Sequence, residues 1–405
     1  MRAASRTSTG PSRSRGSADT LSLCVFIDAF GWEILQRHSF LPELRRVARP
    51  LDTVFGYSST CEPTILTGQA PRDHGHFSFF YYDPPNSPFR ALAPLRLLPR
   101  SLTQRGRVRH WMSRGFKMLS GYTGYFQLYN MPFEHLKLFD YAEKRDLFEP
   151  GGVLSGAPTF FDEARRRRVP YFLADWRASE QQNITALEGA LDRGEPGFAY
   201  LYMAAMDGLL HEVGNGSAGA SRVAAKIAWY EEKIRGLLDI AARRYGTLRL
   251  HVFSDHGMTD TVAECDVMAR IESLGLRFGR DYVASYDSTM ARFWFLEGRA
   301  EERIRAALEE EPAGRVLADE TLVEWGVDFP GQRYGELFYL MNPGVLLNPS
   351  FMGIKAMAGM HGFDPTHKDS VAMYLSNVEV DAPPEGLADM YSLACAEIAL
   401  VEGGG

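Results

Sequence analysis

The chain has 405 residues, enough for one large domain with insertions or for two smaller domains, and its 45% hydrophobic content predicts a sizeable buried core. Its net charge of -7 argues against a general nucleic-acid binder, whose surface would be basic, so we expect no nucleic-acid polymer as a partner. The four cysteines are scattered along the chain and predict neither a disulfide framework nor a zinc-thiolate site.

The N-terminal segment, residues 1–19, is rich in Ser, Arg and Gly and predicts a disordered tail. It lacks the apolar stretch of a secretory signal peptide, and no uninterrupted apolar run of about 18 residues predicts a transmembrane helix. We therefore expect a cytoplasmic location. The sequence indicates no particular oligomeric state.

Apolar runs alternate with helical patterns along the chain, which is typical of an α/β fold with helices against a sheet. Parallel pairing is expected for the core strands, because each is a short, nearly continuous apolar run. These runs are residues 21–27, 171–174, 198–203, 248–254 and 371–375. Segments 223–243 and 387–401 carry apolar residues at helical spacing and are expected to cover the sheet.

Two regions interrupt this alternation, so we expect a catalytic core of residues 20–83, 150–270 and 345–405 with insertions at 84–149 and 271–344. The second insertion predicts a hairpin over 282–295 and an acidic helix over 301–311. The first has no acidic residue from 84 to 133 and several aromatic ones that could stack a base or sugar or contact lipid. Its basic residues could bind an anionic substrate or form a solvated surface, and they are Arg90, Arg96, Arg100, Arg105, Arg107, Arg109, Arg114 and Lys117.

Aspartate and histidine residues follow several of the expected strands. Asp28 ends the first strand, where it could also cap a helix. Asp207 and His211 share one helix face through their spacing of four, Asp255 and His256 close another strand, and His361 lies between glycines before the last strand. Since these strands would end at one edge of the sheet, the side chains would converge on a binuclear metal site. Carboxylates and imidazoles without thiolates suit Zn²⁺, with Mn²⁺ as the alternative.

Three adjacent hydroxyl residues, Ser58, Ser59 and Thr60, precede a predicted helix. Such a hydroxyl can cap the helix or act as a nucleophile activated by a metal ion. The residues alone leave both roles open.

The order of these motifs resembles the type I phosphodiesterase/nucleotide pyrophosphatase branch of the alkaline phosphatase superfamily, over Asp28 to Asp364. The resemblance implies a mostly parallel central sheet with helices on both faces, inserted cap segments and two metal ions. The hydroxyl nucleophile lies ten residues before the glycine of a Thr-Gly pair, which gives Ser58 from Gly68, with Ser59 and Thr60 as alternatives. One ion would be held by Asp207, His211 and His361, and the other by Asp28, Asp255, His256 and Ser58.

The chain departs from that family after His74 and Gly75, where an asparagine that donates to the phosphoryl group is missing. We expect His76 or Ser78 to replace it as a substrate contact, with Tyr81 or an insertion arginine as alternatives. The resemblance implies hydrolysis of a small anionic phosphodiester or pyrophosphate through a serine phosphoenzyme. A phosphomonoesterase or phosphotransferase is the alternative on the same scaffold, and a non-catalytic metal-binding scaffold is the alternative of another class.

Overall fold

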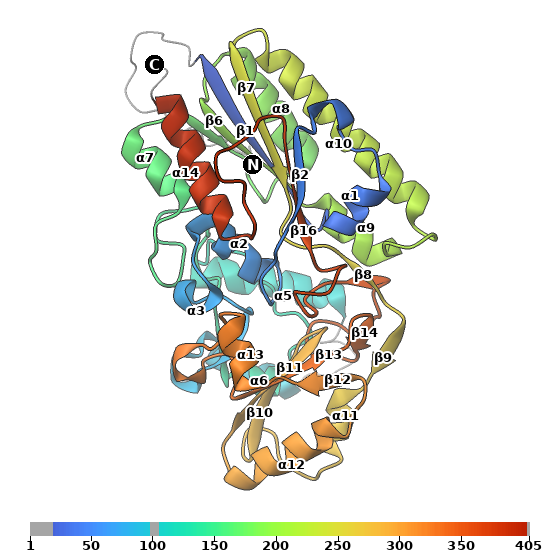
Figure 1. Ribbon diagram of the computed structural model, residues 1–405. Coiled ribbons are helices and arrows are strands. Elements are labelled where there is room, and N and C mark those ends of the chain that lie inside the picture. Colours follow the sequence, from blue (N-terminus) through green and yellow to red (C-terminus); the bar gives the residue numbers. More distant parts are fainter. Residues whose placement is uncertain (1–18, 98–104, 403–405) are drawn as a thin grey trace.

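The computed structural model describes residues 19–97 and 105–402, so the predicted tail lies outside the described residues except for Asp19. It has two lobes, one built around a six-stranded sheet and the other around a four-stranded sheet (Figure 1). The order of the larger sheet is β2-β16-β7-β1-β6-β5. Its strands are β1 (Thr20–Ile27), β2 (Val47–Leu51), β5 (Tyr171–Leu173), β6 (Phe198–Met203), β7 (Thr247–Phe253) and β16 (Ala372–Ser376).

Strand direction in the larger sheet confirms four of the five predicted strands as parallel and corrects the fifth. β1 lies between β6 and β7 and is parallel to both, and β5 is parallel to β6. The strand predicted at 371–375 is antiparallel to both β7 and β2, because apolar content does not encode strand direction. β2 was not predicted, since it carries Arg49 and Pro50; proline is tolerated there because β2 is an edge strand.

Helices cover both faces of this sheet, as expected (Figure 1). One face packs against α1 (Trp32–Arg37), α8 (Glu180–Asp192), α9 (Ala205–Val213) and α10 (Ala220–Ala241). The other face packs against α2 (Ser58–Thr67), α7 (Phe160–Arg167) and α14 (Asp389–Glu402), while α3 (Pro71–His74) follows α2. No helix in the described parts of the chain is long and apolar enough to cross a membrane.

The second lobe contains an antiparallel sheet of order β10-β11-β13-β12, which includes the predicted hairpin. Residues from the two predicted insertions pack into one hydrophobic cluster, in which Phe89 and Tyr141 of the first accompany Val283 and Phe293 of the second. The elements of this lobe are β3 (Phe80–Tyr82), η2 (Pro84–Asn86), η3 (Pro88–Leu97), α5 (Gly106–Ser120), α6 (Phe133–Leu136), β4 (Phe139–Tyr141), β9 (Ala263–Cys265), α11 (Val267–Glu272), β10 (Tyr282–Tyr286), β11 (Met290–Phe295), α12 (Gly298–Glu309), β12 (Gly314–Val316), α13 (Asp319–Glu324), η4 (Pro330–Gln332), β13 (Leu337–Met341) and β14 (Val345–Leu347).

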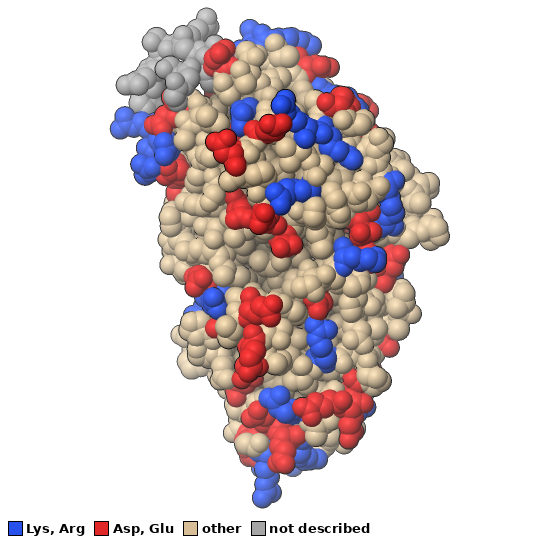
Figure 2. All heavy atoms as spheres, in the orientation of Figure 1, with Lys and Arg blue, Asp and Glu red and all other residues tan. Residues whose placement is uncertain are grey.

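Three short elements complete the fold: η1 (Pro42–Leu44), β8 (Thr259–Asp260) and β15 (Gly359–Met360). Basic and acidic side chains are interspersed over the face drawn in Figure 2. That face therefore has no continuous basic surface of the kind that binds a nucleic-acid backbone.

An ion pair between the partly exposed Arg249 of β7 and the buried Glu397 joins α14 to the sheet. Both guanidinium nitrogens Nε and Nη2 of Arg249 lie 2.7 Å from the carboxylate of Glu397, which is 1% exposed, and His251 lies 3.2 Å from it. Burial alone would raise the pKa of Glu397, but His251 and Arg249 outweigh it and lower that pKa to about 2. The carboxylate therefore stays ionised in the folded protein at neutral pH.

We expect Glu397→Gln to lower the free energy of unfolding by roughly 2 kcal/mol at pH 7, because it leaves the partly buried Arg249 without its carboxylate partner. A lowered folded-state pKa stabilises the protein above the unfolded value of about 4.3, and this contribution disappears as the pH falls toward about 2. Urea unfolding at several pH values measures both effects. Glu402→Gln is the matched control, because Glu402 pairs with Arg167 at the surface and should change stability by about 0.5 kcal/mol or less.

Candidate active site

The carboxyl-end edge of the parallel strands gathers the predicted metal ligands. Asp28 follows β1, Asp207 lies on α9 after β6, and Asp255 and His256 follow β7. Because β16 is antiparallel, its beginning lies at this same edge, and the loop before it carries His361 there. Strand direction thus explains how five separate chain segments meet, the fifth being the start of α2 after β2.

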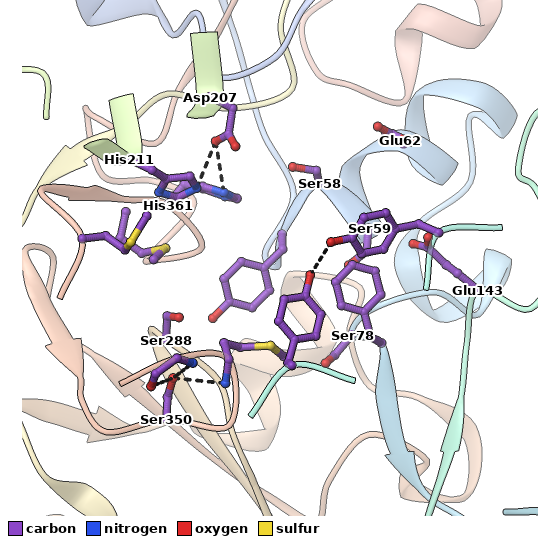
Figure 3. A pocket seen from close by; sticks show the side chains of 18 of the residues that line it. Ser58, Ser59, Glu62, Ser78, Glu143, Asp207, His211, Ser288, Ser350 and His361 are labelled. Carbon is purple, nitrogen blue, oxygen red and sulfur yellow. Dashed lines mark hydrogen bonds and ion pairs between the residues drawn. The ribbon is translucent and has the colours of Figure 1, made fainter. Parts of the chain in front are cut away.

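Asp207, His211 and His361 form the first group, and Figure 3 shows their side chains pointing toward one another. Asp207 Oδ1 lies 3.2 Å from His211 Nε2 and 3.5 Å from His361 Nε2. Asp207 and His211 share a face of α9 at a spacing of four, as predicted, and His361 joins them from the loop before β16.

Asp28, Asp255 and His256 form the second group, which is entirely buried. His256 Nε2 lies 3.1 Å from Asp255 Oδ2 and 3.7 Å from Asp28 Oδ1. Within each group the candidate ligand atoms lie within 4.8 Å of one another. The rings of His256 and His361 stack at 3.7 Å between centroids, so the two groups are adjacent.

Hydrogen bonds fix the orientation of two imidazoles. His211 Nδ1 lies 2.8 Å from the carbonyl oxygen of Gly359, and His256 Nδ1 lies 2.9 Å from that of Gly257. A carbonyl only accepts, so each Nδ1 carries the proton and each Nε2 presents a lone pair to its group. This second contact is the usual support of a metal-binding histidine.

The electrostatics of the groups fit cations. Burial and the neighbouring Asp255 carboxylate raise the pKa of Asp28, and burial together with the nearby His256 ring lowers the pKa of His361. Among the described residues, Asp28 Oδ1, Asp207 Oδ1, Asp255 Oδ2 and His361 Nδ1 are buried without a hydrogen bond of good geometry. Buried carboxylates that face one another beside imidazole rings are the donor set that a divalent cation stabilises.

The backbone around the ligands adopts unusual conformations. Ala29 has a φ of 62°, in the left-handed region that side chains disfavour, and its N–H donates to Asp255 Oδ1 over 3.2 Å. Gly362, after His361, has a φ of 84°, and a Cβ there would come within 2.6 Å of the Tyr57 ring. The closeness of Tyr57 explains why the residue after His361 is a glycine.

Ser58 is distinguished from its neighbours by its contacts. Its hydroxyl lies 3.1 Å from His256 Nε2 and lines a cavity. Ser59 and Thr60 instead donate to the carbonyl oxygen of Phe77, over 3.2 and 2.7 Å. Ser58 is also the first residue of α2, which has no side-chain cap, so the positive end of the helix dipole lies at this hydroxyl.

The two predicted substrate contacts lie in different surroundings. His76 is 1% exposed, is absent from the cavity lining, and accepts a hydrogen bond from the N–H of Leu154 through Nε2. Its ring therefore serves the packing of this loop and does not face the cavity. Ser78 does line the cavity, although its hydroxyl also accepts from the buried Arg292 over 2.8 Å.

The cavity has a volume of about 450 Å³ and lies between the lobes, beside Ser58 (Figure 3). No arginine described in the first insertion lines it: Arg109 is buried and donates to the carbonyl of Met131, and Arg90 donates to that of Pro84. Arg100 and the side chain of Arg96 lie outside the described residues. Of the two roles considered for the basic residues of this insertion, binding of the substrate is therefore not supported for its described arginines.

Several lining residues were not singled out from the sequence. Glu62 could have been found, because it lies one helical turn after Ser58, and its carboxylate accepts from Tyr202 over 2.7 Å. Burial raises the pKa of Glu62 to about 7. Glu143, Asp146 and Trp176 carry no motif and reach the cavity only through the tertiary fold.

Comparisons with known proteins identify the family and the fold of the chain. The family model for type I phosphodiesterase / nucleotide pyrophosphatase matches residues 23–364. Among solved structures, murine ectonucleotide pyrophosphatase / phosphodiesterase 5, as an inactive variant in complex with AMP, is 17% identical, with a TM-score of 0.66 and coverage of 94% of this chain and 95% of that one. The human counterpart is 15% identical, with the same score and coverage.

No curated protein matches the chain in sequence. At their low identities the solved structures establish the fold, which is the expected alkaline-phosphatase-like one. The family model covers most of the chain and carries the assignment further. The chain belongs to the type I phosphodiesterase/nucleotide pyrophosphatase family and is a hydrolase that acts on phosphoric ester bonds.

Proposed function

We propose that the chain hydrolyses phosphodiesters with two divalent metal ions, Zn²⁺ or alternatively Mn²⁺, and with Ser58 as the nucleophile. Asp207, His211 and His361 would hold one ion. The other would be held by Asp28, Asp255, His256 and Ser58. The bound ions would stabilise negative charge on the phosphoryl oxygens and favour the alkoxide form of the serine.

The chain's own residues supply the remaining steps. Ser58 Oγ forms a bond to phosphorus while the bond to the leaving oxygen breaks, and the serine proton ends on the departing alcohol. The resulting serine ester still carries the second substituent of the diester. Water then cleaves this ester and restores the hydroxyl. The uncapped start of α2 directs N–H groups toward the oxygens of the phosphoryl group, a role that the missing asparagine would otherwise fill.

One observation favours a diester over a monoester. The cavity beside Ser58 is large enough for a second substituent, and its lining is mostly apolar and aromatic. Apart from the histidines, Lys355 is the only basic side chain among the described lining residues. A monoester carries a second negative charge on phosphorus and would need more positive charge here.

The test is release of nitrophenol from bis-nitrophenyl and mono-nitrophenyl phosphate in the presence of Zn²⁺ or Mn²⁺. We expect kcat/KM to be at least about tenfold higher for the diester, because only the diester fills the cavity. A preference for the monoester would favour the phosphomonoesterase alternative. Absence of hydrolysis of any ester would favour the metal-binding scaffold.

A further inference from the structure

The cavity beside Ser58 has a continuous aromatic wall. The Phe79 ring lies 5.2 Å from that of Tyr125 and 5.7 Å from that of Tyr129, between centroids. Trp176 continues the wall, 6.3 Å from Tyr125, and Tyr202 faces the cavity near Ser58. Aromatic faces carry negative potential, so such a wall attracts flat apolar groups and also cations.

Carboxylates lie in the same cavity. Glu143 is 6% exposed, and no described residue forms a hydrogen bond or an ion pair with its side chain. Burial and the nearby Glu62 raise its pKa. Glu62 Oε1 accepts a hydrogen bond from Tyr202. Figure 3 places both glutamates on the side of the cavity near Ser58 and Ser59.

The positive charges near these glutamates are engaged elsewhere. The Lys117 ammonium donates to the carbonyl of Gly124, and Arg177 forms an ion pair with Asp146 over 2.8 Å. Both cations lie over the Trp176 ring, at 5.5 and 4.3 Å from its centroid. Glu143 is therefore a buried acceptor that faces the cavity without a cation of its own, and a cation bound beside it would favour the ionised carboxylate.

We propose that the cavity binds an alkylammonium group carried by one alcohol of the phosphodiester, between the aromatic wall and the carboxylates of Glu62 and Glu143. This rests on the proposed function, since it names the substituent of the ester that Ser58 attacks. A nucleoside could also stack on the rings, but it would leave the buried carboxylate without a counter-charge. A substituent with a further phosphate would meet two carboxylates at close range.

The experiment compares two nitrophenyl phosphodiesters that differ only in charge. One carries choline and the other carries tert-butylethyl, the uncharged carbon isostere of choline. We expect KM to be about tenfold lower for the choline ester, because its cation contacts the aromatic rings and a carboxylate away from water. The kcat values of the two esters should be similar. The KM of an ethanolamine ester shows whether the methyl groups on the nitrogen contribute to binding.

The variant Glu143→Gln should raise KM for the choline ester about tenfold, so that the difference in KM between the two esters disappears. Glu320→Gln, which removes an exposed glutamate on α13 outside the cavity, is the control and should change neither ester. Equal KM values for the two esters in the native enzyme would overturn the inference, as would a preference for a nucleoside ester. Those results leave phosphodiester hydrolysis intact.

Calorimetric titration with phosphocholine separates this inference from the proposed function. Binding that is weakened about tenfold by Glu143→Gln supports the cation site even if no ester is hydrolysed. Equal affinity for phosphocholine and tert-butylethyl phosphate overturns it. If no ester is hydrolysed but phosphocholine still binds more tightly than tert-butylethyl phosphate, only the proposed function is contradicted.

Discussion

Replacing Ser58 with alanine is expected to lower kcat for a phosphodiester by about 10³-fold or more, because the variant has no oxygen to form the bond to phosphorus. Substrate binding should change little, since the cavity, the aromatic wall and the six carboxylate and imidazole ligands are untouched. Single-turnover release of nitrophenol measures the effect. Metal content and the unfolding midpoint, measured on the same preparation, confirm that the variant is folded.

The neighbouring hydroxyls provide matched controls. Ser59→Ala removes a hydroxyl that donates to Phe77, and should retain kcat within about tenfold. Thr60→Ser keeps the hydroxyl that donates to Phe77 and should also retain kcat within about tenfold. If Ser58→Ala stays active while one of these controls, or Thr60→Val, is inactive, the nucleophile has been assigned to the wrong residue.

Replacing Asp255 with asparagine is expected to remove one metal ion per chain and to lower kcat by about 10³-fold or more. The change is nearly isosteric: the amide oxygen can keep the contacts of Oδ1 with the N–H groups of Ala29 and His256. The amide nitrogen then replaces Oδ2, which has no hydrogen bond of good geometry among the described residues. Metal analysis of the purified protein gives the stoichiometry.

Asp239→Asn on the exposed face of α10 is the control for the loss of a carboxylate and should keep both ions and full activity. Chelation should inactivate the native enzyme, and added Zn²⁺ or Mn²⁺ should restore it. An Asp255→Asn variant with unchanged metal content would contradict the proposed second group of ligands. Activity that survives complete removal of metal would contradict both groups.

The parts of the fold that follow from local sequence could be predicted. Apolar runs located β1, β6 and β7 to within one residue, because a buried parallel strand is apolar on both faces. The direction of β16 could not be predicted, since it depends on where the chain enters the sheet. The packing of both insertions into one cluster was also missed, because it joins residues about 200 positions apart, such as Phe89 and Phe293.

The candidate site also has parts that the sequence predicted and parts that it did not. The ends of parallel strands predicted that Asp28, Asp255 and His256 lie at one edge of the sheet, whereas their assignment to one ion came from the family resemblance. His76 has the chemistry of a ligand, but tertiary packing turned it toward the N–H of Leu154. Glu143 carries no local signal at all, since only the folded cavity shows that it is buried without a partner. The cytoplasmic location stays a prediction.

The stereochemistry at phosphorus tests the central claim most directly, because it reports the number of displacements without requiring a trapped intermediate. A chiral phosphorothioate diester is hydrolysed in isotopically labelled water, and the configuration of the product is determined. Attack by Ser58 followed by attack of water consists of two in-line displacements, so we predict retention of configuration. Inversion would mean direct attack by water and would contradict a covalent serine intermediate.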